Sequence, residues 1–404
     1  MTTSALKAPR RRTWLRVVLA LVAVLAVLIL VGLLDAWAAL GTTPQGPRLA
    51  RILESRQYRE GKFVNTIARV EPDVWTAMAR WLQGVEHSRP SAPLPIARRT
   101  AGDFATPPAS DLRITWFGHS TLLVEIEGRR VLFDPVWSER CSPSSFIGPT
   151  RFHPVPMSLE ALPPLDAIVI SHDHYDHLDY STIARLSRLH VPFVVPLGVG
   201  AHLEYWGVAP SLIHELDWWQ ETRVAELRLV ATPARHFSGR GLQSDGTLWA
   251  GWAVLGKRRR VYYSGDTAMF EGFEQIGARL GPFDATMIEV GAYDALWADV
   301  HLGPEQAVAA HRAVRGGVLF PVHWGTFDLA LHSWVEPAER VLAAARAVNV
   351  AVVTPRPGQS IDALAPPEPE RWWPRVPWYT AKEKPVVSSG LTPLEPTGPS
   401  APPG

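Results

Sequence analysis

The sequence predicts an α/β fold in which helices cover the outer faces of β-sheets. Short apolar runs of β-forming residues begin at Leu112 and recur almost to the end of the chain. Helical stretches lie between several of these runs, and an alternation of strands and helices favours sheets with helices packed outside them. Apolar residues make up 47% of the 404 residues and charged residues 20%, a composition that can bury a large core.

The expected elements follow in chain order. Two strands, 114–117 and 122–126, precede a turn at 127–130 and a third strand at 131–133, which predicts a hairpin. The later strands are predicted at 167–170, 193–195, 227–231, 261–263, 285–288, 318–321 and 351–353. The helices are predicted at 180–189, 271–279, 304–314 and 337–347. Pro304 and Pro337 support the last two, because proline suits the first turn of a helix.

The regions that flank this alternation differ from it in composition. Apolar residues recur at helical spacing between Val74 and Val85, and a proline-rich stretch follows up to Pro108. A second proline-rich stretch begins at Pro366, and we expect it to be disordered or draped over the surface, with its first part held by Trp372, Trp373, Trp378 and Tyr379. We therefore divide the chain into four regions. Residues 1–38 are a basic segment with a membrane helix or cleavable signal, and residues 39–110 are a helical preamble with a linker. Residues 111–365 are a catalytic domain, and residues 366–404 are a proline-rich tail.

The N-terminal segment predicts a transmembrane helix. Residues 17–34 form an unbroken run of 18 apolar or glycine residues, which is long enough to cross a bilayer. Basic residues precede the run, so the N-terminus is expected in the cytoplasm and the catalytic domain outside it. Arginines between 48 and 59 weaken that orientation.

Two other interpretations of the segment remain open. The sequence Ala36-Trp37-Ala38 resembles a signal-peptide cleavage site, and residues 11–16 resemble a twin-arginine export signal. The apolar run is longer than the usual core of a signal peptide, which favours a retained, single-pass anchor.

Charge and cysteine content exclude some classes of function. The formal net charge is +1, which argues against a chain-wide electrostatic grip on nucleic acid. The single cysteine, Cys141, excludes an intramolecular disulfide and a cluster of zinc-binding thiolates.

The densest chemical signal is the sequence Ser-His-Asp-His-Tyr-Asp-His at residues 171–177, directly after a predicted strand. Alternation along an extended chain puts His172 and His174 on one side, where both can reach one metal ion. Asp176 and His177 come as the chain turns, and can face a second ion. Imidazole and carboxylate ligands suit zinc, while the lack of thiolates leaves iron or manganese open.

Further potential ligands follow other predicted strands. His236, Asp266 and His323 each lie just beyond an apolar run, where a rigid sheet can hold a loop in place. A single histidine after a strand is usually only a hydrogen-bonding residue. The three residues are significant as ligand candidates only together, because of their order along the chain.

That order resembles the metallo-β-lactamase superfamily, whose fold is an αββα sandwich. The resemblance implies that His172, His174 and His236 hold a first metal and that Asp176, His177 and His323 hold a second. Asp266 would bridge the two ions. Two metals about 3.5–4 Å apart can share a water and bring its pKa near neutral, and we expect Asp266 and Asp176 to take part in catalysis, with Asp266 accepting the water's proton.

Five shorter motifs resemble the N-acylphosphatidylethanolamine phospholipase D group: residues 133–143, 148–151, 215–219, 236–240 and 323–327. The match covers roughly residues 112–356. It implies a di-zinc hydrolase that uses a metal-bridging hydroxide to cleave a phosphodiester in a phospholipid or another anionic ester, next to a membrane. A relative that acts as an ascorbate-6-phosphate lactonase keeps a lactonase or other small-ester hydrolase open. A non-catalytic, metal-stabilised scaffold ranks last, and a dimer is possible.

Three further residues are candidates for supporting roles. Asp134 can orient a ligand histidine, as metal-bound imidazoles usually need an acceptor for their other N–H, or it can cap the turn before Pro135. His119 is expected near the ligands or as a structural residue. His301, just before a predicted helix, is a substrate contact or an ordinary loop residue.

Overall fold

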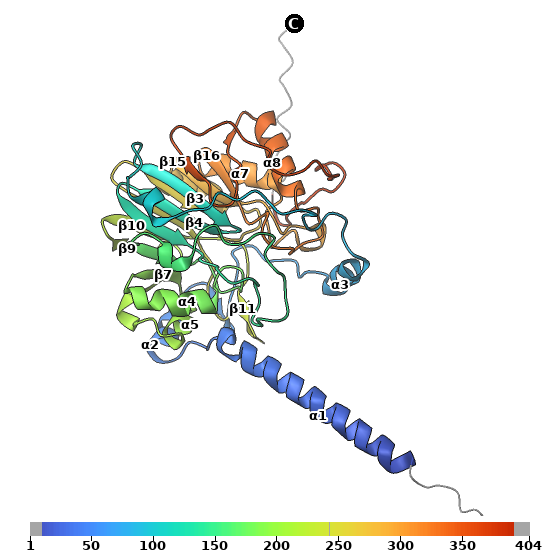
Figure 1. The fold of residues 1–404 in the computed structure, drawn as a ribbon. Helices are drawn as coiled ribbons and strands as arrows, with labels where there is room; N and C mark the ends of the chain where they lie inside the picture. The colour runs from blue at the N-terminus through green and yellow to red at the C-terminus, as the bar shows by residue number, and fades with distance from the viewer. Residues whose placement is uncertain (1–9, 242, 392–404) are drawn as a thin grey trace, which may run out of the picture.

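The computed structural model describes residues 10–241 and 243–391, in which the strands form two seven-stranded sheets packed face to face (Figure 1). The first has the order β18-β3-β4-β5-β6-β7-β8 and the second β17-β16-β15-β14-β13-β10-β9. The strands of the first sheet are β3 (Leu112–Gly118), β4 (Thr121–Ile126), β5 (Arg129–Phe133), β6 (Ala167–Val169), β7 (Phe193–Pro196), β8 (Ile213–Leu216) and β18 (Ser360–Asp362). Those of the second are β9 (Glu221–Val224), β10 (Leu227–Thr232), β13 (Gly251–Leu255), β14 (Arg260–Tyr263), β15 (Phe283–Glu289), β16 (Gly316–Val322) and β17 (Ala351–Val352).

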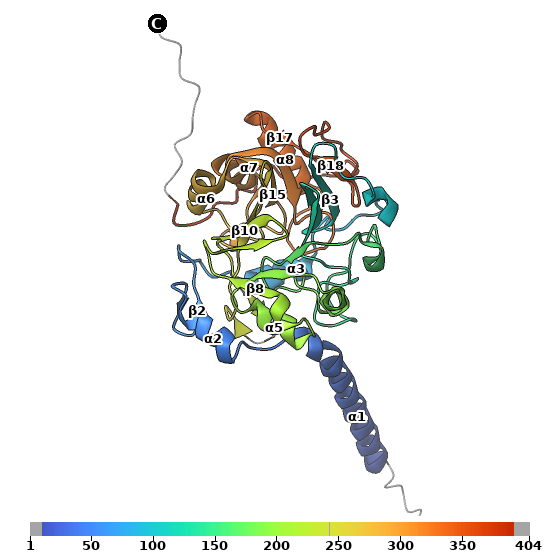
Figure 2. The same ribbon diagram turned by 90° about the vertical axis from the view of Figure 1, so that its left-hand side faces the viewer.

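Helices cover both outer faces of this sandwich. α4 (Tyr180–Leu186) and α5 (Val199–Tyr205) lie on the first sheet, and α6 (Gly272–Leu280), α7 (Pro304–Ala313) and α8 (Glu336–Ala347) lie on the second (Figures 1 and 2). The αββα sandwich predicted from the sequence is therefore confirmed. The helix predicted at 180–189 ends as an α-helix at Leu186, and a 3₁₀ turn, Ser187–Leu189, completes it.

Each sheet changes from antiparallel to parallel pairing near its middle. β4 and β5 are antiparallel, with Leu122 opposite Phe133, whereas β5 and β6 are parallel. The second sheet repeats the pattern, since β13 and β14 are antiparallel and β14, β15 and β16 are parallel. The carboxyl ends of β5, β6, β14, β15 and β16 consequently meet along one edge of the sandwich, and this edge carries the site.

The core follows the period-two alternation of the strands. In β6, Val169 joins the cluster between the two sheets, while Ile168 joins the cluster beneath α4 and α5. Trp116 and Phe117 divide in the same way. Both faces of the central strands are thus buried, so these strands are continuous apolar runs in the sequence.

The N-terminal helix α1 (Arg10–Trp37) projects away from the sandwich (Figure 1). Among the described residues it is the one helix long and apolar enough to cross a membrane, and none of its apolar window is buried. Its end is tied to the domain through a 3₁₀ turn, Ala38–Leu40, where Trp206 Nε1 donates to the carbonyl of Ala38. Lys7 of the predicted basic segment lies outside the described residues.

The region predicted as a preamble and linker packs against the sandwich. It contains α2 (Gly46–Leu53), the short strands β1 (Tyr58–Arg59) and β2 (Lys62–Phe63), α3 (Val74–Gln83) and a 3₁₀ turn, Ala101–Phe104. α2 lies beside α5 and β8 (Figure 2), and Arg48 forms an ion pair of 2.7 Å with the buried Glu215. The proline-rich stretch is held by backbone hydrogen bonds such as Ala97 N–H to the carbonyl of Pro357.

The tail segment 366–391 runs over the surface without helix or strand. Of the two predicted alternatives, a disordered tail and a tail draped over the surface, this segment follows the second. Trp373 is buried, and Trp372 packs against Trp324 with ring centroids 5.5 Å apart. Residues 392–404 of the predicted tail lie outside the described residues. The short hairpin of β11 (Gly239–Arg240) and β12 (Gln243–Ser244) completes the fold.

Candidate metal centre

Loops that follow strands of both sheets bring the predicted ligands together. His172 to His177 follow β6, His236 follows β10, Asp266 follows β14 and His323 follows β16. The loop that carries Asp266 passes close to the loop after β6. Gly265 makes this possible, because its φ is +56° and a Cβ at this position would lie 2.7 Å from Cβ of Ser171.

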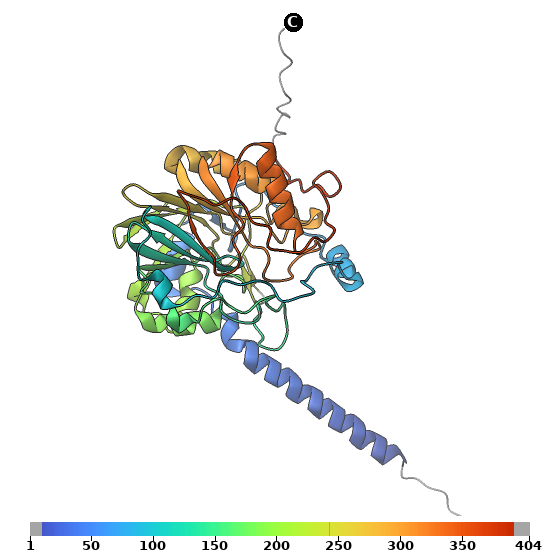
Figure 3. The same cartoon turned by 45° about the horizontal axis from the view of Figure 1, so that its top comes forward.

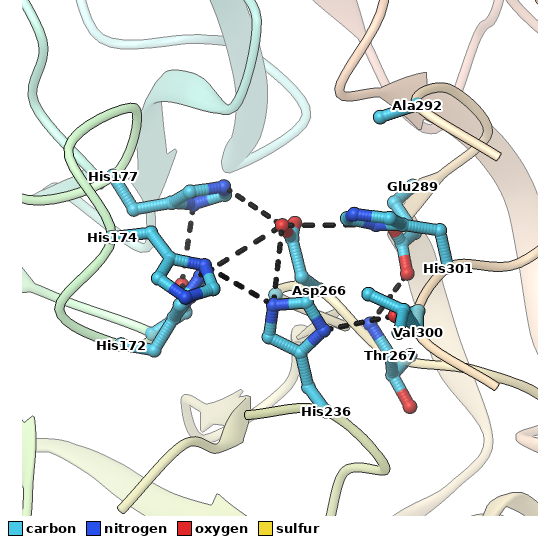
Figure 4. A network of polar contacts seen from close by, with 12 residues as sticks. His172, His174, His177, His236, Asp266, Thr267, Glu289, Ala292, Val300 and His301 are labelled. Carbon is cyan, nitrogen blue, oxygen red and sulfur yellow. Dashed lines mark hydrogen bonds and ion pairs between the residues drawn. The ribbon is translucent and has the colours of Figure 1, made fainter. Parts of the chain in front are cut away.

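The carboxylate of Asp266 lies at the centre of the cluster (Figure 4). Its Oδ2 is 3.1 Å from Nε2 of His177 and 3.1 Å from Nε2 of His323. The same oxygen is 3.8 Å from Nε2 of His172 and 3.8 Å from Nε2 of His236. One carboxylate therefore reaches imidazoles from both expected metal-binding groups.

Three four-residue groups have ligand atoms within 4.8 Å of one another, and the third of them contains Asp266, Glu289, His301 and His323. The first contains His172, His174, His236 and Asp266. Nδ1 of His174 is 2.9 Å from Nε2 of His172 and 3.3 Å from Nε2 of His236, so these nitrogens converge on one point. The structure thus brings together all the residues that the resemblance gives to the first metal.

The second group contains Asp176, His177, His323 and, in addition, His119. Oδ2 of Asp176 is 3.3 Å from Nε2 of His323, and Nε2 of His119 is 2.9 Å from the same oxygen. His119 therefore contacts a predicted ligand directly, which places it closer to the metal site than the sequence indicated.

Second hydrogen bonds fix how three of the histidines point. Nδ1 of His177 is 2.7 Å from Oδ2 of Asp134, and Nδ1 of His236 is 2.9 Å from the carbonyl oxygen of Val300. Nδ1 of His172 is 2.9 Å from Oγ of Ser171. These contacts leave Nε2 of each ring facing the centre, which is the arrangement typical of metal-bound imidazoles.

Residues with strained backbone conformations lie at the same edge of the sandwich. His119, Asp134 and His323 all have positive φ, at 52°, 36° and 65°, which is uncommon for residues other than glycine. The peptide N–H of His323 donates to the carbonyl of His119 at 3.0 Å, so two of these turns hold each other in place. Such strain is found mainly where the surrounding structure over-determines a functional site.

Burial and charge set the protonation of the cluster. Burial alone would lower the pKa of His323, but the carboxylates of Asp266 and Asp176 beside it raise that pKa to about 10. Burial lowers the pKa of His119 to about 3 and that of His301 to about 4. The pKa of Asp266 stays well below its usual value against the effect of burial, because His177 and His323 stabilise the carboxylate. The carboxylates thus favour the protonated form of His323, whereas burial favours the neutral forms of His119 and His301.

His301 is not an ordinary loop residue. Its Nδ1 is 2.7 Å from Oε2 of Glu289 and 3.8 Å from Oδ2 of Asp266 (Figure 4). The side chain keeps some contact with solvent, whereas Glu289 is fully buried. Burial, together with the charge of Asp266, raises the pKa of Glu289.

Glu289 itself was missed by the sequence reasoning. It ends β15 in the run Met287-Ile288-Glu289, and an acidic residue that closes a buried strand next to other ligand-bearing strands was an available signal. Asp173 was missed as well. Its carboxylate accepts hydrogen bonds from the backbone N–H of Gly239 at 2.7 Å and from Oγ1 of Thr247 at 3.0 Å, which ties the histidine loop to the segment between β10 and β13.

The cluster has the properties expected of a metal site. Among the described residues, Nε2 of His177, Oδ1 of Asp266 and Nε2 of His323 are buried polar atoms with no hydrogen-bond partner. Such atoms are costly unless something compensates them. They all belong to the predicted ligands, so the donor set of imidazoles and carboxylates fits a bound cation.

Known proteins are similar to this chain in sequence and in fold. Residues 129–324 match the β-lactamase superfamily domain. An N-acyl-phosphatidylethanolamine-hydrolyzing phospholipase D of Caenorhabditis elegans is 39% identical over 262 residues, which cover 61% of this chain and 73% of that protein. The chain belongs to the metallo-β-lactamase superfamily. An uncharacterized superfamily relative in Mycobacterium tuberculosis is 52% identical over 335 residues, covering 79% of this chain and 88% of that one.

Two further proteins bear on the class of activity and on the fold. A metal-dependent hydrolase of Pyrobaculum aerophilum is 28% identical over 238 residues, covering 58% of this chain and 94% of that protein. The solved structure of a possible metal-dependent hydrolase from Veillonella parvula has a TM-score of 0.51 at 17% identity, over 62% of this chain and 98% of that one, and shows the shared fold. The chain is a metal-dependent hydrolase that resembles the phospholipase D group, as the sequence predicted. The kind and number of metal ions stay predictions.

Proposed function

We propose that the chain is a two-zinc phosphodiesterase that hydrolyses a membrane phospholipid of the N-acylphosphatidylethanolamine type. The observation that carries this proposal is the position of Asp266, whose Oδ2 lies 3.1–3.8 Å from imidazoles of both ligand groups. A carboxylate shared by two groups suits a pair of ions that act on one phosphoryl group. The named activity of the Caenorhabditis elegans relative supports the substrate class.

The ligand assignment follows the first two of these groups. His172, His174 and His236 would hold one ion, Asp176, His177 and His323 would hold the other, and Asp266 would bridge them. Zinc suits this set, while iron and manganese accept the same ligands. When bound, the two ions supply Lewis acidity for the phosphoryl oxygen and bring the pKa of water near neutral.

Residues of the chain perform the rest of the reaction. The unpaired Oδ1 of Asp266 is placed to accept the proton of the attacking water, and Asp176 holds His119 and His323 in position through its Oδ2. Asp134 fixes the ring of His177. The partly solvent-accessible His301 is a candidate contact for the substrate, since Glu289 fixes one side of its ring.

The N-terminal helix would keep this site at its substrate. We propose that α1 is a retained, single-pass anchor with a cytoplasmic N-terminus and an extracytoplasmic catalytic domain. Residues on both sides of the Ala36-Trp37-Ala38 sequence contact the domain, since Asp35 accepts hydrogen bonds from Ser144 and Ser145, and the carbonyl of Ala39 accepts one from Arg240. Cleavage after Ala38 would remove the contacts of Asp35, which supports retention.

The experiment that tests the proposal uses the full chain in phospholipid vesicles after zinc loading. It is offered N-acylphosphatidylethanolamine and, separately, a panel of soluble phosphodiesters and lactones. Release of phosphatidic acid together with an N-acylethanolamine supports the proposal. Turnover of only lactones or small soluble esters would reject it in favour of the lactonase alternative. Protein treated with a chelator is the matched control, and it should recover activity when zinc is added back.

A further inference from the structure

The helix α3 (Val74–Gln83) turns its apolar face away from the protein. Val74, Trp75, Met78, Trp81 and Leu82 lie at spacings of one, four, seven and eight residues, which places them on one face of a helix. All five are exposed, and Trp75 and Leu82 are 86% and 82% exposed. The less exposed positions in the middle of the helix are Thr76 and Ala77. An amphipathic helix on a soluble domain normally has the opposite orientation, so this face needs a partner.

A second exposed apolar pair lies beside the membrane helix. Phe146 and Ile147 are 66% and 75% exposed. They directly follow Ser144 and Ser145, which hold the carboxylate of Asp35 through three hydrogen bonds of 2.7–2.8 Å. Because Asp35 is in the last turn of α1, the pair is fixed at the depth where α1 leaves the bilayer.

The length of α1 supports this depth. Trp14 and Trp37 are both exposed near its two ends, and their separation of 23 positions in the sequence corresponds to about 35 Å of helix. That distance is close to the hydrocarbon thickness of about 30 Å, and tryptophan is enriched at both membrane interfaces. α3 projects from the domain on the same side as α1 (Figures 1 and 3). The two exposed apolar surfaces and the membrane helix therefore lie on the same side of the domain.

We propose that α3 and the Phe146–Ile147 pair form a second membrane contact that holds the catalytic domain in a fixed orientation on the bilayer. The contact rests on the proposed role of α1 as an anchor, and its partner is the lipid interface. Trp75 and Trp81 suit this interface because their rings are apolar bodies with a polar N–H.

The contact also gives the site access to lipid. The segment after α3, residues 83–87, lines a cavity of about 810 Å³ together with Tyr293, Asp294 and residues 331–333. His332 is shared by this cavity and a smaller one that is lined by His119 and His323 of the metal centre. Arg80 of α3 lies 3.9 Å from Asp294, and both residues line the larger cavity. α3 therefore lies beside a cavity that borders, through His332, the side chains next to the metal centre.

A fluorescent probe can test the contact without any substrate. Leu82→Cys in the full chain is labelled with an environment-sensitive dye and reconstituted in phosphatidylcholine vesicles. Cys141 should stay unlabelled, because it is buried and burial raises the pKa of its thiol. Val348→Cys, an exposed apolar position just after α8, is the matched control. We expect lipids with a spin label in the acyl chain to quench the Leu82→Cys probe at least twofold and to leave the Val348→Cys probe unchanged.

Two results would overturn the proposal. Quenching of the Leu82→Cys probe by aqueous iodide, with no effect of the spin-labelled lipid, would show that α3 faces water. Shielding of the probe from both quenchers would show that another protein surface, such as a second copy of the chain, covers the helix. Because neither readout depends on turnover, a failure of the proposed phospholipase activity leaves this test intact.

Activity measurements separate delivery from chemistry. A triple variant with Trp75→Gln, Met78→Gln and Leu82→Gln should hydrolyse bilayer substrate about tenfold more slowly, while a short-chain phosphodiester dispersed in detergent should be cleaved at the unchanged rate. Equal losses on both substrates would point to a folding defect and reject a role in membrane contact. Val348→Gln is the control for an added polar residue at an exposed apolar position.

Discussion

Replacing Asp134 with asparagine tests whether the orientation of one imidazole determines metal binding. Asp134 is fully buried, and its Oδ2 accepts three hydrogen bonds: from Oγ of Ser171 at 2.6 Å, from Nδ1 of His177 at 2.7 Å and from the hydroxyl of Tyr263 at 2.5 Å. Oδ1 accepts a fourth from the backbone N–H of Ser171. In Asp134→Asn, an amide NH₂ at the Oδ2 position would face three donors.

The three donors differ in how they can adjust. The hydroxyls of Ser171 and Tyr263 can rotate and accept from the amide, but Nδ1 of His177 can accept only if the ring's proton moves to Nε2. Nε2 is the atom that faces Asp266 and that we assign to a metal. Loss of an outer hydrogen-bond partner typically costs 10–100-fold in metal affinity. The variant should show a loss in this range, together with a decrease of about 2 kcal/mol in stability from weakened buried hydrogen bonds.

Zinc affinity is measured by competition with a fluorescent chelator, and stability by thermal unfolding followed by circular dichroism. Tyr263→Phe is the matched control, because it removes one donor and leaves the contact between Asp134 and His177. It should lower zinc affinity less than threefold. If Asp134→Asn binds zinc as tightly as the unmodified protein, the proposed control of the His177 tautomer is wrong.

Four other outcomes follow from the structure. Asp266→Asn should reduce turnover by at least a hundredfold while the circular dichroism spectrum stays unchanged; near-normal turnover would remove Asp266 from the mechanism. Chelation should abolish hydrolysis, and metal analysis of the reactivated protein should give two zinc ions per chain, whereas one ion would contradict the bridging role. Burial lowers the pKa of His311 to about 4; below about pH 6.5 the unfolded chain binds a proton that the folded chain does not, so stability should decrease by about 2 kcal/mol from this residue between pH 7.5 and 5.0. His311→Gln should be less sensitive to acid in thermal unfolding, and an equal sensitivity would exclude this residue as the cause. Ser389→Ala removes the hydroxyl that donates to Oδ2 of Asp299, so it should lower zinc affinity severalfold in the chelator competition assay, with no change in the fold.

The clustering of the candidate ligands was predictable because their signal is local. Each lies directly after an apolar run, and a strand that is buried on both faces shows in the sequence as such a run. The loop after β6 alone offers His172, His174, Asp176 and His177 within six residues. The resemblance of the later residues, in their order, to the metallo-β-lactamase superfamily then placed His236, Asp266 and His323 at the same edge.

Partners in space were not predictable from this local signal. His119 contacts Asp176 at a separation of 57 residues, and Glu289 contacts His301 only because a 3₁₀ turn, Ala295–Trp297, brings the chain back. The helical spacing at residues 74–82 indicated a helix but not which way its apolar stripe faces. Periodicity gives the position of a stripe on a helix, and only the packing of the surrounding chain decides whether that stripe meets protein or lipid.

The tail shows why composition alone was a poor guide to its role. Its Ser389 donates from the backbone N–H to Oδ1 of Asp299 at 2.7 Å, and its carbonyl accepts from the guanidinium of Arg235 at 2.9 Å. Arg235 and Asp299 are buried and form an ion pair of 3.0 Å. Arg235 directly precedes the ligand His236, and Asp299 directly precedes Val300, whose carbonyl oxygen orients the ring of His236. Ser389, more than sixty residues after the last predicted ligand, thus contacts both Arg235, the neighbour of His236 in the chain, and Asp299, the neighbour of Val300. We therefore expect the stability of the metal site to depend on the docking of the tail.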